Sequence, residues 1–240
     1  MIPEGHEREH PFWTYEDLAL FVGATLPVLL LAALLLRFAR VLAPAALSNQ
    51  TVSTMVFQSI IYSLMLGALY VAISVRYGQP FWASLGWTQS YRGAYLCLFA
   101  GPPLSLGLMV LAAAVHAPAG ESKIEELITG RASLITLMVF AILIGPVFEE
   151  TIFRGFLFPL LERSLGVWPG IVVTAIPFAL LHGPQYQWAW QQVMVVALAG
   201  VAFGYARYKT QSTTASMMVH SGYNATVFIL YILQRWVFSK

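Results

Sequence analysis

The sequence is poor in charge, because charged residues make up only 10% of its 240 residues. A soluble domain carries about 25% charged residues, most of them on a hydrated surface. Hydrophobic residues instead make up 58% of this chain. The scarcity of charge excludes an ordinary soluble domain and predicts an integral membrane protein.

The scarcity of cysteine and the lack of basic clusters further narrow the class of protein. The chain has one cysteine, Cys97, so it cannot form an intramolecular disulfide, and the apolar surroundings of Cys97 favour a small core side chain. The 13 Lys and Arg residues are scattered singly and the net charge is +2, which argues against a nucleic-acid partner. Residues 1–17 lack the basic segment of a cleavable signal peptide, so we expect the first apolar run to remain as a membrane span.

The sequence contains many long apolar runs. A helix needs about 20 apolar residues to cross the hydrocarbon layer. We therefore expect one polytopic, all-α domain covering residues 1–240, a bundle of seven to eight transmembrane helices around an intramembrane polar cavity. The candidate spans are 18–36, 54–75, 96–115, 133–145, 147–161, 170–182, 192–208 and 215–232.

The number of spans depends on the dipeptide Gly145-Pro146. Proline removes a backbone donor and clashes with the preceding turn, so it either kinks one helix or starts another. Pro146 suits the first position of a new helix, and we favour a break that gives eight helices. The aromatic connection 183–191 is either an interfacial belt, which we favour, or a lid over a cavity.

Ionisable and amide side chains are rare within the spans. Such a group costs several kcal/mol at membrane depth, so each one is a functional candidate by default. Away from the span ends, the candidates are Glu149, Glu150, Arg154, His182, His220 and Asn224. Each could simply form a hydrogen bond or ion pair between helices. Their joint occurrence in the second half of the chain favours a shared site.

Helical spacing separates the two glutamates. At about 100° per residue, Arg154 lies about 40° from Glu150 but about 140° from Glu149. Glu150 and Arg154 therefore share a face as an i, i+4 pair, and the guanidinium keeps Glu150 ionised. Glu149 points elsewhere and is a candidate general base facing a cavity.

Three short motifs follow one another on successive spans: EETIFR at 149–154, FALLH at 178–182 and HSGYN at 220–224. They resemble the EExxxR, FxxxH and HxxxN motifs of the CPBP family of intramembrane endopeptidases, the Abi-type family that includes CAAX prenyl proteases and bacteriocin-processing enzymes. Each motif alone is weak, whereas the ordered set is specific. The resemblance covers about residues 143–227, the motif-bearing core of the domain.

The resemblance implies an intramembrane protease in which Glu149 and His182 activate a water for attack on a peptide carbonyl. It also implies that His220 and Asn224 hold the developing oxyanion. The residues that would shape the site are Glu150, Arg154 and Phe178.

The substrate that the resemblance implies is a membrane-anchored or lipidated protein or peptide, cut near its C-terminus. CAAX-type processing, removal of a C-terminal sorting signal and maturation of a peptide precursor all fit this description. Ala- and Leu-rich spans with few lysines favour a bacterial inner membrane, which makes a prenylated substrate less expected.

Several alternatives stay open at this point. Glu149, His182 and His220 could hold a zinc ion with an open position for water, although we favour a metal-free enzyme without a cofactor. A catalytically silent scaffold or immunity protein, or a proton-coupled transporter, could also carry these polar groups. The chain lacks the GxSG of rhomboid-type proteases, and its single aspartate, Asp17, excludes a two-aspartate site. We also expect no HExxH zinc helix of the site-2 type.

Overall fold

The computed structural model describes residues 10–87, 93–118 and 123–238, and this part of the chain is helical without any strand. The predicted all-α class is therefore confirmed. The long helical segments are α1–α2 (Tyr15–Gly23, Thr25–Leu42), α4–η1 (Gln50–Tyr70, Val71–Val75), η2–α6 (Ala94–Ala100, Gly101–Ala114), α8–η3–α9–η4–α10 (Arg131–Val139, Phe140–Ile144, Gly145–Glu150, Thr151–Leu157, Phe158–Leu165), α11 (Val167–His182), α12 (Trp190–Thr210) and α13 (Thr213–Phe238). The short connecting helices are α3 (Pro44–Leu47), α5 (Phe81–Ser84), α7 (Lys123–Glu126) and η5 (Gly183–Tyr186).

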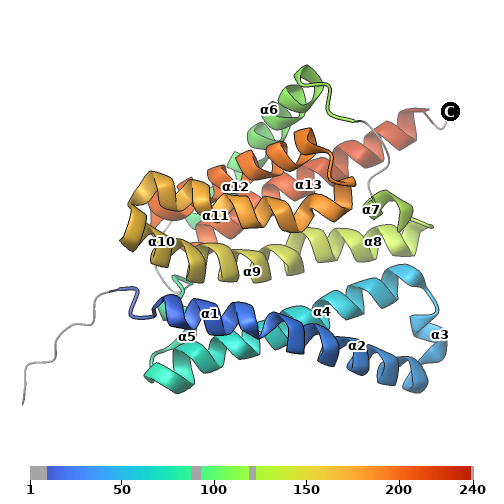
Figure 1. Ribbon diagram of the computed structural model, residues 1–240. Helices are drawn as coiled ribbons and strands as arrows, with labels where there is room; N and C mark the ends of the chain where they lie inside the picture. Colours follow the sequence, from blue (N-terminus) through green and yellow to red (C-terminus); the bar gives the residue numbers. More distant parts are fainter. Residues whose placement is uncertain (1–9, 88–92, 119–122, 239–240) are drawn as a thin grey trace, which may run out of the picture.

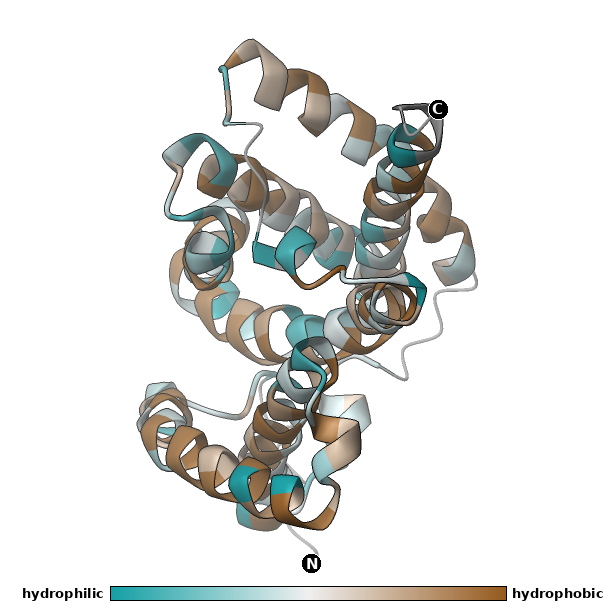
Figure 2. Ribbon diagram, turned by 90° about the vertical axis from the view of Figure 1, so that its right-hand side faces the viewer, coloured by the Kyte–Doolittle hydropathy of each residue, from teal (hydrophilic) through white to brown (hydrophobic). Residues whose placement is uncertain are grey.

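Five segments are long and apolar enough to cross a membrane, judged by length and composition. They are Tyr15–Leu42, Gln50–Val75, Ala94–Ala114, Arg131–Leu165 and Val167–Tyr186. Hydrophobic residues predominate along these segments (Figure 2). Many of them are exposed, including Leu20, Leu26 and Leu30, each more than 60% exposed. The chain is an integral, multi-pass membrane protein, as predicted. With α12 and α13 included, the described residues form seven long helical segments, the lower of the two predicted numbers of spans.

The predicted helix break at Pro146 is wrong. The chain runs as one 35-residue helical segment from Arg131 to Leu165. Two stretches of this segment, η3 and η4, are π-helical, and the amide of Gly145 bonds to the carbonyl of Phe140, five residues earlier. A π turn is wider than an α turn. The missing donor of Pro146 thus costs one hydrogen bond at the end of a π turn and leaves the helix continuous.

This long segment lies between two layers of helices (Figure 1). On one side, α1, α2 and α4 pack against its C-terminal half through a cluster that includes Trp13, Phe21, Leu69, Phe156 and Leu160. On the other side, a second cluster joins it to α6, α11, α12 and α13. The buried members of that cluster are Leu108, Phe153, Phe178, Val195, Ala199, Phe203 and Val219. Polar residues on the segment can therefore face either layer.

The start of α1 is fixed by a buried carboxylate. Asp17 is fully buried, and its side chain accepts hydrogen bonds from Arg76 Nη1 at 2.7 Å and Tyr77 Oη at 2.6 Å. Burial, followed by donation to Asp17, raises the pKa of the Tyr77 hydroxyl above its ordinary value. These contacts tie the first segment to the end of α4–η1.

Glycines allow the closest helix crossings. A Cβ atom on Gly101 would lie 2.3 Å from the backbone of Gly222, and one on Gly222 would lie 2.2 Å from the carbonyl oxygen of Leu98. Gly200 and Gly204 similarly face side chains of α11, so their GxxxG spacing serves packing within the chain. Because Gly222 belongs to the HSGYN motif, the crossing with η2–α6 helps to fix the position of that motif.

Candidate active site

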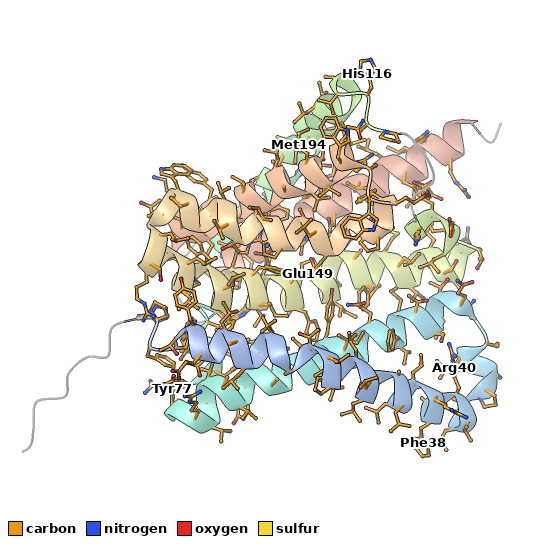
Figure 3. The ribbon with its side chains drawn as sticks, viewed as in Figure 1. Phe38, Arg40, Tyr77, His116, Glu149 and Met194 are labelled. Atoms are coloured by element: carbon orange, nitrogen blue, oxygen red, sulfur yellow. The ribbon has the colours of Figure 1, made fainter. Side chains whose placement is uncertain are left out.

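The two adjacent glutamates end α9 and face different layers. Glu149 points towards α4, where Tyr62 Oη donates a 2.8 Å hydrogen bond to its Oε1. Its side chain is 18% exposed and lies in the middle of the molecule, at the level where the two layers meet (Figure 3). The predicted separation of Glu149 from Glu150 is present in the structure.

Glu150 is fully buried, and three side chains donate to its carboxylate. Oε1 accepts from Arg154 Nη1 at 3.0 Å and from His220 Nδ1 at 2.9 Å. Oε2 accepts from the hydroxyl of Ser216 at 2.7 Å. The expected ion pair with Arg154 is thus present, and it belongs to a larger network that satisfies both oxygens.

Arg154 is enclosed on every side. Its Nη2 donates to the carbonyl of Gly200 at 2.7 Å, and its guanidinium lies 4.6 Å from the ring centre of Phe178 and 5.4 Å from that of Phe203. A Cβ atom on Gly200 would lie 3.3 Å from Arg154 Nη2, so the absence of a side chain at Gly200 leaves space for the guanidinium. The aromatic rings and the Glu150 carboxylate together stabilise a charge buried at membrane depth.

His220 connects the two glutamates. Its Nδ1 must donate, because the Glu150 carboxylate only accepts, and its Nε2 lies 3.8 Å from Glu149 Oε2. Its ring stacks on Phe203 with the centres 4.4 Å apart. When both ring nitrogens carry a proton, His220 and Arg154 balance the two carboxylates and the cluster is electroneutral.

His182 and Phe178 lie at the edge of this cluster. His182 Nδ1 donates to the carbonyl of Phe178 at 2.8 Å, which leaves Nε2 for another partner. The Phe178 ring centre is 4.7 Å from that of His182 and 5.9 Å from that of His220. In the part of the chain that the structure describes, no hydrogen bond or ion pair joins His182 to Glu149.

Asn224 lies one turn after His220 and contacts the long helix. Its Nδ2 donates a 2.7 Å hydrogen bond to the carbonyl of Ala141. In the π register of η3, that carbonyl would pair with the amide of residue 146, which is a proline and has none. The Asn224 side chain therefore satisfies a backbone acceptor that Pro146 leaves free.

The described side chains do not fit a zinc centre. Among the residues placed by the structure, no group of three or more His, Cys, Asp or Glu side chains is arranged to hold a metal ion. The set predicted for that alternative, Glu149, His182 and His220, is not assembled, and His220 Nδ1 is already bound to Glu150. The metal-free mechanism stays a prediction.

Sequence reasoning missed two residues at the site and one motif elsewhere in the chain. Tyr62 comes from the half of the chain without motifs, and its only signal is a hydroxyl within an apolar span. Ser216 had a clearer signal, because it precedes His220 by four residues and so shares its helix face. Away from the site, the expected absence of the zinc-binding pattern HExxH is wrong, because HEREH at 6–10 matches it; of these residues the structure describes only His10, whose Nε2 bonds to the carbonyl of Ser84.

The connection after His182 is tightly folded. Trp188 donates its amide to the carbonyl of Gly183, and its ring would lie 2.4 Å from a Cβ on that glycine. Trp188 and Trp190 are 60% and 64% exposed. Exposed indoles at the end of a span are typical of an interfacial belt, the interpretation favoured from the sequence.

Comparison with known proteins supports the motif assignment. Residues 131–226 match the family model of type II CAAX prenyl endopeptidases, Rce1-like. The chain is also 26% identical over 95 residues to the UPF0177 protein YbdI of Lactococcus lactis subsp. lactis (strain IL1403), a match that spans 40% of this chain and 49% of that protein. The chain thus covers about half of the length of this curated relative. No solved structure matches.

Proposed function

Residues 131–226 match the Rce1-like model of type II CAAX prenyl endopeptidases, and on this premise we propose that the chain is an intramembrane endopeptidase. It hydrolyses a peptide bond near the C-terminus of a membrane-associated substrate. The observation that carries this proposal is the contrast between Glu150, which is buried and saturated with donors, and Glu149, which is partly exposed and has one hydrogen bond. Only Glu149 has an oxygen available for a water.

Glu149 acts as the general base in this mechanism. Tyr62 occupies Oε1, whereas Oε2 is 3.8 Å from His220 Nε2, too far for a direct hydrogen bond and suited to a bridging oxygen. A water at this position gives its proton to Glu149 and attacks the peptide carbonyl carbon. When the tetrahedral intermediate collapses, the C–N bond breaks and Glu149 gives that proton to the leaving amine. His182 assists through Nε2, since its Nδ1 proton is held by the carbonyl of Phe178.

His220 and Asn224 stabilise the oxyanion that the attack creates. In its doubly protonated form, His220 donates from Nε2 while Glu150 holds Nδ1 and so orients the ring. Asn224 gives one amide hydrogen to Ala141 and keeps a second one for the oxyanion. Glu150, Arg154 and Phe178 are positioning residues that hold these donors in place.

The substrate is a peptide segment anchored in the membrane by a lipid or an apolar tail. The family description supports a prenylated C-terminus, and the apolar outer surface places the bundle in the bilayer, where such a chain is anchored. Removal of a C-terminal sorting signal and maturation of a peptide precursor require the same chemistry.

The test uses the full chain in liposomes with peptides that end in a CAAX sequence, each prepared with and without a prenyl group. We expect Glu149→Gln to lower kcat/KM by about 10²–10⁴-fold, the usual contribution of a general base, without loss of folded protein. Glu16→Gln is the matched control, because that side chain is 84% exposed. In intact membranes, the Glu149→Gln protein should also accumulate uncleaved precursors for identification.

Two results would contradict the proposal. One is equal cleavage, or an unchanged cellular phenotype, in the Glu149→Gln and Glu16→Gln proteins, which would favour a catalytically silent scaffold. The other concerns the mechanism alone: stoichiometric zinc in the purified protein, with cleavage abolished by its removal, would replace the metal-free scheme.

A further inference from the structure

A second polar cluster lies at one end of the bundle, away from the glutamates. The chain before α1, the end of α10 and the end of α12 meet there around a pocket of about 170 Å³. Its polar lining consists of His10, Glu162, Arg163, Arg207 and Gln211. No step of the proposed proteolysis uses these residues.

Arg207 is the unexplained residue of this pocket. Its side chain lines the pocket although the residue is only 4% exposed, and its Nε is buried without a hydrogen-bond partner. Within the described residues, no carboxylate lies within ion-pair distance of its guanidinium. Glu162 lines the same pocket and offsets part of the cost of burying this charge, but not through direct contact, so a bound anion that contacts the guanidinium would stabilise it further.

The walls around Arg207 are fixed. A Cβ on Gly86, which has a positive φ of 76°, would lie 2.9 Å from Arg207 Nη2, so the loop backbone closes over the guanidinium. Arg163 donates to the carbonyls of Pro11 and Trp13 and so holds the chain before α1 against α10. The guanidinium of Arg207 is therefore held in a site that is already formed.

The charges of the pocket favour an anion. Arg163 and Arg207 contribute two positive charges and Glu162 contributes one negative charge, which leaves an excess of one positive charge. Gln211 Nε2 donates one hydrogen to the carbonyl of Tyr208 and keeps a second one that an anion could accept. The acidic Glu162 should weaken the affinity of an anion without reversing it.

Exposed residues at the same end of α12, on another face of the helix from Arg207, are typical of the headgroup region of a membrane. Trp168 is 60% exposed and stacks on Tyr205 with ring centres 5.9 Å apart, and Lys209 lies over the same tyrosine. Exposed aromatic residues beside basic ones mark the interface, where lipid phosphates are concentrated. A planar guanidinium matches two oxygens of a phosphate group.

We propose that this pocket binds a phosphate group, such as that of an anionic phospholipid headgroup, through Arg207. The site is distinct from the proposed catalytic centre and does not depend on the proposed protease activity. Its ligand ties the start of α1 to the ends of α10 and α12, so binding stabilises the folded protein.

The experiment measures thermal unfolding of the full chain in a phosphate-free buffer and a detergent without phosphate. Three probes are titrated: dihexanoylphosphatidylglycerol, inorganic phosphate, and dioctanoylglycerol, which lacks phosphate. We expect the first to raise Tm in a saturable way and the third to leave it unchanged. Stabilisation by inorganic phosphate as well would identify phosphate itself as sufficient, whereas stabilisation by the lipid alone would assign the site to headgroups.

Variants decide whether the effect comes from this pocket. Arg207→Gln should weaken the apparent Kd for the phosphate probe by at least about tenfold. Glu162→Gln should tighten it several-fold, and Lys209→Gln, which removes an exposed charge from the same helix, should change it less than about twofold.

The proposal is overturned if no phosphate probe raises Tm, if dioctanoylglycerol raises it equally, or if Arg207→Gln and Lys209→Gln behave alike. Should Arg207→Gln fail to fold, Glu162→Gln decides alone, and an unchanged affinity in that variant counts against the site.

Discussion

Glu149 and Glu150 show how strongly one helical step changes the environment of a carboxylate. Glu150 accepts from Arg154, His220 and Ser216 and is fully buried, so its geometry is fixed. Glu149 accepts from Tyr62 alone and keeps some exposure. The first arrangement suits a group that positions others, and the second suits a group that exchanges a proton with a water.

Tyr62 should matter for turnover more than for substrate binding. Tyr62→Phe keeps the ring, which stacks on Phe148, but removes the hydrogen bond that orients Glu149 Oε1. A hydrogen bond to a charged group contributes about 1.5–3 kcal/mol, so we expect kcat to fall by roughly 10- to 100-fold with KM nearly unchanged.

The control for this prediction is Tyr70→Phe on the same helix, at a residue that is 51% exposed. Steady-state cleavage of the lipidated peptide compares the two variants. Equal activity in both would show that Tyr62 does not hold the catalytic carboxylate.

Spacing along one helix predicted those contacts of the site that form within that helix. The i, i+4 relation gave the Glu150–Arg154 pair and the separation of the two glutamates, because helical geometry fixes both. Tyr62 could not be found in this way, since it is 87 residues away from Glu149 and only helix packing brings them together.

At the scale of elements, the long helix from Arg131 to Leu165 combines a proline with π-helical turns. The sequence predicted a break because proline was judged against an α-helical hydrogen-bond register. In the π register, the loss is confined to one acceptor, the carbonyl of Ala141, and α13 supplies a donor for it from Asn224. Whether the helix breaks at Pro146 thus depends on a contact with a distant helix, which the sequence alone does not reveal.

This arrangement predicts energetic coupling between Pro146 and Asn224. Asn224→Ala should lower the free energy of unfolding by about 1–3 kcal/mol, because it leaves a buried carbonyl unsatisfied. In a Pro146→Ala background, a backbone N–H is restored one turn after that carbonyl, so the same change should cost less.

Chemical unfolding of the four proteins of this double-mutant cycle, in detergent, gives the coupling energy. Additive effects, with a coupling energy within about 0.5 kcal/mol of zero, would contradict the assignment.

For the whole molecule, the site depends on contacts between its two halves. The proposed oxyanion residues lie on α13, and that helix is placed by the crossing of Gly222 with Gly101 of the motif-free half. Composition predicted the class of the protein, and apolar runs predicted most of the spans. The pairing of helices was not predictable, since uniformly apolar helices in lipid carry little information about their neighbours.

Gly101→Ala should therefore destabilise the whole helix bundle. Its Cβ would overlap the backbone of Gly222, and we expect a loss of about 1–3 kcal/mol in the free energy of unfolding together with reduced cleavage. Gly107→Ala in the same helix is the matched control, because its Cβ would meet no atom within 4 Å, and it should be neutral or stabilising. Equal unfolding midpoints for the two variants would rule out the crossing as a determinant of stability.

The π turn at Phe140–Ile144 also limits how the chain can change in length. A π turn contains one residue more than the α turn that it replaces, and one residue corresponds to about 100° of rotation. Removal of one residue from Phe140–Ile144 can convert the π turn into an α turn, which leaves the glutamates in phase with the helix before them. The same deletion within α9 has no extra residue to absorb it and would turn Glu149 by about 100°, away from Tyr62. A single deletion should thus be better tolerated within the π turn than between Gly145 and Glu149.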